Sequence, residues 1–188
     1  MEDQLKHEWL ATLEVGGKAF HAELTHISDA LAARTPGEGG WSILECVEHV
    51  TVAESELLLR LRRAKPDPQT EANPAREGII SQRAKDRKQR IEAPAGSRPA
   101  GRFKTLLEAL AGFDQARAET IRWLREFSGD LRGYFTDHPL IPGPVSCHEI
   151  LLLIAAHPAR HSIQVHEIRS RLESGLGPES HSGSTASG

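Results

Sequence analysis

Two histidines four residues apart carry the first chemical signal in this chain. His157 and His161 begin and end the segment HPARH, and both fall on the apolar stripe of a predicted helix. Positions four apart share one helix face, so both imidazoles should point into the core. A buried imidazole needs partners for its ring nitrogens, and a metal ion can be one of them. The pair therefore predicts part of a metal site.

A third histidine strengthens this prediction. His49 lies on the apolar stripe of another predicted helix, between Cys46 and Val50. Three imidazoles from two facing helices leave at least one coordination position open to water, which is typical of catalytic sites rather than closed structural ones. Imidazole suits zinc, nickel, copper and iron. We expect one divalent ion, zinc or nickel, held by His49, His157 and His161.

Two better-known metal motifs do not fit. A zincin helix needs Glu directly after its first histidine, and Pro158 stands there instead. A di-iron bundle needs two Glu-x-x-His motifs, and only Glu23 and His26 form one. Pro158 also lacks the N–H that would bond to Ile154, so it should bend the helix beside His157.

Other polar residues are weaker candidates. Glu45 precedes His49 by four residues and could act as a catalytic base, but with Ser42 it also fits a capping box. Cys46 is expected in the core. Asp114 and Arg117 share an apolar face, where they could form a buried ion pair or line a cavity. Five other histidines are assigned to the surface or to a supporting role, or have no predicted partner: His148, His166, His7, His21 and His26.

Helical periodicity dominates the chain, and no alternating run predicts a strand. The four expected helices cover about residues 5–31, 42–65, 103–127 and 146–171. Residues 65–102 form a long connection in which 76–91 could make a short helix. These features predict an all-α domain at 1–173, a four-helix bundle with a long crossover between its second and third helices. The Ser/Gly-rich segment 174–188 is expected to be a disordered tail.

Composition is that of an ordinary globular protein. No apolar run of about 18 residues predicts a membrane span, and the acidic N-terminus does not resemble a secretory signal. The only cysteines are Cys46 and Cys147, so we expect a reduced, cytoplasmic protein.

The net charge is −3, yet residues 62–104 hold 12 Lys and Arg against 5 Asp and Glu. This segment could attract an acidic partner, although a solvated connection explains its charge more simply. Few aromatics accompany it to suggest nucleic-acid binding.

Three segments resemble one known family. WSILECVEHV resembles the W-S-x-x-E-x-x-x-H start of the second helix in the DinB-like (YfiT-like) superfamily, and HEILLLIAAHPARHSIQVHEI resembles its fourth helix. The stretch IEAPAGSRPAGRFKTLLEALAGFDQARAETIRWL is similar to the middle of these proteins. The resemblance implies a four-helix bundle with a divalent metal on His49, His157 and His161, and a homodimer.

The resemblance also implies a range of activities. Characterised relatives include transferases and isomerases that use bacillithiol or mycothiol, and others are described as metal-dependent hydrolases. The first hypothesis is therefore a metalloenzyme that acts on a small molecule, with a low-molecular-weight thiol as one candidate. The second is a bundle that binds a metal or small ligand without turnover. The third is a bundle whose histidines are satisfied by hydrogen bonds alone.

Overall fold

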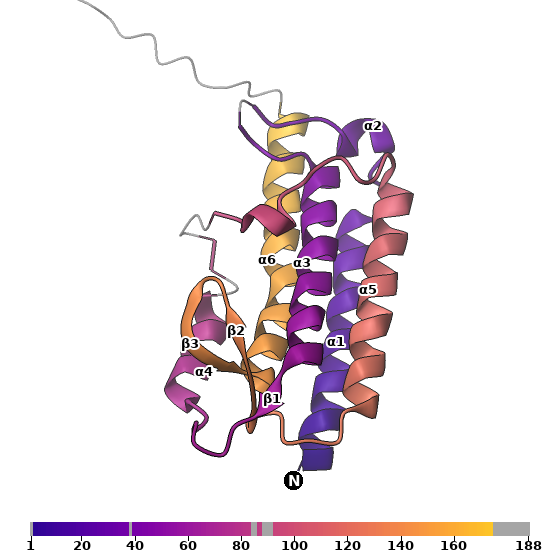
Figure 1. The fold of residues 1–188 in the computed structure, drawn as a ribbon. Coiled ribbons are helices and arrows are strands. Elements are labelled where there is room, and N and C mark those ends of the chain that lie inside the picture. The colour runs from indigo at the N-terminus through magenta and orange to yellow at the C-terminus, as the bar shows by residue number, and fades with distance from the viewer. Residues whose placement is uncertain (1, 38, 84–85, 88–91, 175–188) are drawn as a thin grey trace, which may run out of the picture.

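Four long helices run side by side through the molecule (Figure 1). This computed structural model describes residues 2–37, 39–83, 86–87 and 92–174. The long helices are α1 (Glu2–Leu24), α3 (Ile43–Arg63), α5 (Leu106–Glu126) and α6 (Cys147–Glu173). Helix α3 packs against α5 and α6, and α1 closes the ring by packing against the same two helices. The predicted four-helix bundle is confirmed.

Local sequence signals fix where three of these helices begin. Capping boxes open α3 at Ser42, α5 at Thr105 and α6 at Ser146, and in each the cap residue and the Glu three positions later exchange hydrogen bonds. These bonds satisfy backbone N–H groups that the first helical turn leaves without partners. The bundle interior is mostly apolar, and Cys46 lies fully buried in it, as expected.

The first predicted helix is two helices in the structure. Helix α1 ends at Leu24, and α2 (Asp29–Ala32) starts after a separate cap at Ser28. Between them, His26 adopts a left-handed backbone with φ of 66°. The apolar stripe continues through this break, which is why periodicity alone suggested one helix.

The expectation of no strands is wrong. A small antiparallel sheet has the order β1 (Lys65–Pro66), β2 (Tyr134–His138) and β3 (Ile141–Ser146). Strands β2 and β3 form a hairpin with a register irregularity between Thr136 and His138. Strand β3 contains Pro142 and Pro144, and proline is rare inside strands, so the sequence of this segment does not look like a strand. An edge strand tolerates proline because its outer N–H groups are not needed for pairing.

The connection between α3 and α5 contains β1, helix α4 (Pro74–Arg83) and a 3₁₀ turn, η1 (Ala95–Ser97). Figure 1 shows α3 and α5 running in the same direction, so this connection returns along the length of the bundle. Turn η1 packs on α3. Within the described ranges, no helix is long and apolar enough to cross a lipid bilayer. The predicted tail lies outside the described residues from 175 onward, and the domain boundary stays a prediction.

Candidate metal centre

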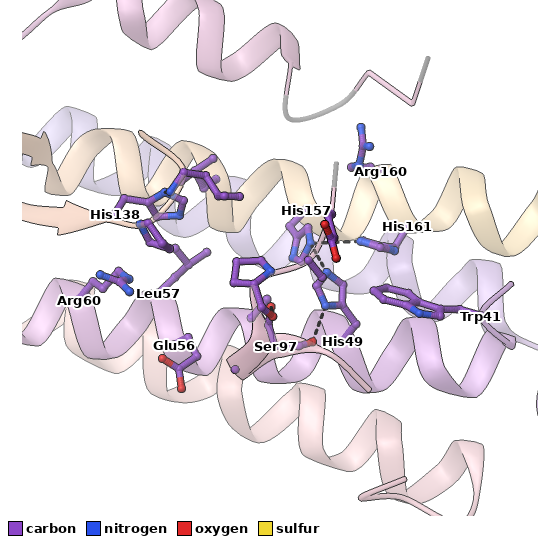
Figure 2. A pocket seen from close by; sticks show the side chains of 18 residues that line it. Trp41, His49, Glu56, Leu57, Arg60, Ser97, His138, His157, Arg160 and His161 are labelled. Atoms are coloured by element: carbon purple, nitrogen blue, oxygen red, sulfur yellow. Dashed lines mark hydrogen bonds between the residues drawn. The ribbon is translucent and has the colours of Figure 1, made fainter. Parts of the chain in front are cut away.

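The three predicted histidines meet where α3 faces α6 (Figure 2). His157 Nε2 lies 3.0 Å from His49 Nε2 and 3.1 Å from His161 Nε2. One ligand nitrogen from each ring lies within 4.8 Å of the other two. Two ligands of a tetrahedral zinc ion, at about 2.0–2.1 Å from the metal, are about 3.3 Å apart. The spacing of these nitrogens is therefore close to that of a metal-ligand set.

The hydrogen bonds of His49 fix its tautomer. His49 Nδ1 donates to the backbone carbonyl of Ser97 at 2.7 Å, so in the neutral ring Nε2 carries a lone pair. This arrangement, an imidazole oriented by a carbonyl behind it, is the usual support for a metal-binding histidine. His161 Nδ1 is buried and has no hydrogen-bond partner among the described residues. The fold therefore fixes the tautomer of His49 but not that of His161.

Hydrogen bonds among the rings cannot satisfy the cluster. His157 Nε2 faces both other Nε2 atoms. If it is protonated it can donate to His49, but then it has no lone pair to accept from His161. If it is unprotonated, it meets the lone pair of His49 directly. A cation accepts electron density from all three nitrogens at once, so the donor set fits a bound metal ion.

Burial keeps these rings neutral. Loss of water lowers the pKa of His157 to about 3, and the charges of His49 and Arg160 add to the effect. Burial likewise lowers the pKa of His49, against the opposing hydrogen bond to Ser97, and holds the pKa of His161 well below its ordinary value. Neutral imidazole is the form that binds metals, so protons compete weakly with an ion at pH 7.

A buried carboxylate anchors the loop that orients His49. Glu48 is 1% exposed, and its oxygens accept hydrogen bonds from the backbone N–H groups of Ala100, Gly101 and Arg102 at 2.6–3.1 Å. The Arg102 side chain adds an ion pair at 2.7 Å. Burial tends to raise the pKa of Glu48, but these hydrogen bonds outweigh it and lower the pKa. Glu48 thus holds the segment that follows Ser97.

A cavity of about 450 Å³ opens beside the three histidines. Trp41 closes one end, where its ring centroid lies 4.8 Å from that of His49. The walls are mainly apolar, and at the opposite end lie Arg60 and His138 (Figure 2). The volume is in the range of small-molecule sites.

The structure places Glu45 in its capping box, where Oε2 accepts from Ser42 N at 2.7 Å. Glu45 lines a neighbouring cavity of about 690 Å³ and is not among the residues that line the cavity at the histidines. Its catalytic role stays a prediction.

Asp114 and Arg117 do not pair with each other and line neither of these cavities. Arg117 is buried and makes a two-point ion pair with Glu54 at 2.7 and 2.8 Å. Asp114 lies at the surface, where His21 is its partner at 2.7 Å.

The sequence left His148 either at the surface or in a supporting role, and the structure shows that it is buried. It is 6% exposed, and its Nδ1 accepts a hydrogen bond from Trp9 Nε1 at 3.3 Å. Arg132 and Glu77 contact its other nitrogen. His148 therefore belongs to a buried polar network that docks α4, apart from the three-histidine cluster. His166 is exposed, as expected.

Sequence reasoning also missed residues around the cluster. Ser97 contributes a backbone carbonyl, which no side-chain pattern can reveal. Trp41 was visible as the first residue of the WS motif, but nothing in the sequence said that its ring would lie against His49. Arg60 and His138 are 78 positions apart and meet only because the β2–β3 hairpin folds back on α3.

A four-helix bundle with three convergent histidines defines the class of protein, and comparison gives the family. Residues 12–165 match the DinB superfamily, so the chain belongs to it. No match is found among curated proteins.

Three solved structures share the fold. TT2238, described as a four-helix bundle protein, is 23% identical with a TM-score of 0.55, covering 86% of this chain and 98% of its own. YfiT from Bacillus subtilis, described as a probable metal-dependent hydrolase with an unusual four-helix bundle topology, is 17% identical with a TM-score of 0.55, covering 92% and 90%. A conserved Enterococcus faecalis protein is 14% identical with a TM-score of 0.60, covering 89% and 96%.

Proposed function

We propose that this protein is a divalent-metal-dependent enzyme that acts on a small molecule, as a homodimer in the cytoplasm. The observation that carries the proposal is the convergence of three imidazole nitrogens, from two buried rings and one half-buried ring, at the edge of a cavity large enough for a substrate. His49, His157 and His161 would hold the ion, and zinc or nickel suits an all-imidazole set.

The chain's own residues supply positioning and a water-poor wall. Ser97 orients His49, and Trp41 covers one side of the cluster. The bound ion would supply Lewis acidity, which lowers the pKa of a coordinated water toward about 7 and keeps a coordinated thiol deprotonated. Both hydrolysis and the transfer of a low-molecular-weight thiol to a substrate are compatible with this chemistry. The description of YfiT as a probable metal-dependent hydrolase supports hydrolysis.

A second candidate function is binding without turnover. In the described part of the chain, the only metal-competent group contains three histidines and no carboxylate. Glu92 and Glu56 line the cavity, but the Glu92 side chain is 84% exposed and pairs with Arg98, and Glu56 is also exposed. No carboxylate in these ranges is thus held against the histidines as a base, which favours a binding bundle unless the substrate brings its own nucleophile.

The experiment is elemental analysis of protein purified without an affinity tag. The His157→Ala, His161→Ala double variant is compared with wild type and with His166→Gln, a matched control at an exposed histidine of the same helix. We expect close to one divalent ion per chain in wild type and control, and none in the double variant. Metal-loaded protein is then screened with thiols and with ester and amide substrates. Wild-type protein that holds no ion and takes up none after dialysis against several divalent metals would refute the proposal.

A further inference from the structure

The cavity beside the histidines is long and follows the groove between α3 and α6. Its α3 side is formed by one face of the helix, at spacings of four, four and three: His49, Ala53, Leu57 and Arg60. His49 and Arg60 are 11 residues apart. At 1.5 Å per residue they are about 16 Å apart along the helix axis. A ligand that fills this groove is therefore elongated.

The middle of the groove is apolar. Ala53 and Leu57 form one wall, and Leu153 of α6 lies four residues before His157 on the opposite wall. Pro139 and Leu140 from the hairpin cover this part. Such a surface favours a hydrocarbon body, since burial of apolar area is the main gain from binding there.

The end away from the histidines presents hydrogen-bond donors. Leu140 N donates to His138 Nδ1 at 3.2 Å, so the neutral ring carries its proton on Nε2. Burial, with a further contribution from Arg60, lowers the pKa of His138 to about 4, so this ring is a neutral donor at pH 7. Arg60 contributes a guanidinium at the same end (Figure 2).

Arg60 has donors to spare for a ligand. Its hydrogen bonds to the described residues both come from Nη1, to the backbone and side-chain oxygens of Asp137 at 2.8 and 2.9 Å. Nε and Nη2 remain on the edge that matches a carboxylate. Two carboxylates could repel an anion there: Asp137, which is 93% exposed, and Glu56, which lines the cavity but is also exposed. Water and salt screen the repulsion from both.

We propose that this cavity binds an elongated monocarboxylate. Its apolar body lies against Ala53, Leu57 and Leu153, and its carboxylate accepts hydrogen bonds from Arg60 and His138. The group that reacts lies at the opposite end, beside the histidines; only this last placement rests on the proposed function. The inference names the substrate class as medium-chain molecules that carry a terminal carboxylate.

The test is titration calorimetry of the protein as purified, with octanoate, 1-octanol and acetate as probes. We expect octanoate to bind more tightly than the other two, because only octanoate has both the apolar body and the anionic end. Arg60→Gln should weaken octanoate binding at least about ten-fold through loss of charge-assisted hydrogen bonds, and leave 1-octanol unaffected. Ala53→Leu, which narrows the groove, should weaken octanoate and 1-octanol together.

Arg62→Gln is the matched control, because Arg62 is on the same helix but pairs with Glu119 outside the cavity. It should bind octanoate as wild type does. The proposal is overturned if octanoate does not bind, or if Arg60→Gln and Arg62→Gln bind it equally. It is also overturned if His157→Gln abolishes binding while Arg60→Gln does not, since the carboxylate would then sit at the histidines.

Metal content is measured in the same samples. Arg60-dependent binding to protein that takes up no metal would support this inference while refuting the proposed function.

Discussion

Arg117 and Glu54 form a buried ion pair in the centre of the bundle. Their side chains are 6% and 2% exposed, and Arg117 also donates to the Leu13 carbonyl at 2.7 Å. Arg117→Met should destabilise the protein by about 3–5 kcal/mol, because Glu54 would be left as an uncompensated buried charge. The double variant Glu54→Leu, Arg117→Met should recover much of this loss. Urea unfolding measures both. A single variant as stable as the double variant would contradict the argument.

At the same scale, the sequence identified the side chains that lie on a periodic stripe, but it did not identify the residues that they contact. His49, His157 and His161 were found because two helix faces point inward at a fixed spacing. Arg117 was recognised as inward-facing, but the only partner considered for it was Asp114, three positions away. Glu54 comes from another helix, and sequence spacing carries no information about which helices are neighbours.

At the scale of elements, the segment after η1 determines how well His49 is oriented. Glu48→Gln should lower metal affinity about 10–100-fold, the usual effect of losing an outer partner of a ligand. One amide oxygen cannot replace a carboxylate that accepts from three backbone N–H groups and Arg102. Competition with a chelating dye measures the affinity.

Glu54→Gln is the control for this effect, since Glu54 is a buried carboxylate of the same helix whose partner Arg117 lies away from the histidines. It should cost stability but not metal affinity. Equal affinities for the two variants would mean that Glu48 serves the fold alone. A second check is the tautomer of His49 in nitrogen NMR spectra, which should lose its single Nδ1–H form in Glu48→Gln.

Two helical glycines should respond to alanine with opposite signs. A methyl group at Gly78 of α4 would meet no atom within 4 Å beyond its own helix backbone and chain neighbours, whereas at Gly112 of α5 it would lie 2.7 Å from Cζ of Phe103. Gly78→Ala should stabilise by about 0.5–1 kcal/mol through lower backbone entropy of the unfolded chain. Gly112→Ala should destabilise, because overpacking costs about 1–3 kcal/mol and exceeds that gain. Thermal melting of both variants checks the signs, and a stabilising Gly112→Ala would show that Phe103 moves aside freely.

The elements that sequence analysis missed are those made by tertiary contact. The hairpin β2–β3 is short and rich in proline. It is held in place by β1, which pairs with β2, and by α6, which contacts both strands. Conversely, capping boxes are local: the one recognised at Ser42 gave a correct helix start, and the fourth helix was correctly expected to begin at Ser146, where the structure has another. The same box at Thr105 was present in the sequence, with Glu108 three positions later, and would have placed the start of α5 three residues closer to its true position than Phe103 did.

At the scale of the whole molecule, the bundle was predictable because four apolar stripes must be buried against one another. The cavity was not, since its far end joins α3 to a hairpin that the sequence did not show. This end decides which ligand fits, so the fold class could be predicted in advance and the ligand class could not.

The stability of the metal-free protein should fall as the pH falls below about 6.5. Histidines in the unfolded chain take up protons near that pH, whereas burial holds the pKa of His157 at about 3 and also lowers the pKa of His49 and His161. The unfolded state then binds more protons than the folded state, so acid favours unfolding until the pH passes the folded pKa values. Below about pH 4.5 the lowered pKa of Glu48 adds to the loss in the same direction.

Urea midpoints at pH 7 and pH 5 measure this effect, with and without a divalent ion. An ion that binds only the folded state should raise the midpoint at both pH values, because it adds about 2.7 kcal/mol to the free energy of unfolding at a hundred-fold excess over its Kd. His157→Gln removes one buried imidazole and should flatten the pH dependence while abolishing the response to metal. His166→Gln, at an exposed position of the same helix, should change neither. A wild-type midpoint that is equal at pH 7 and pH 5 would mean that the three histidine rings take up protons in the folded state as readily as in the unfolded state. The three rings would then not be a neutral, water-excluded ligand set.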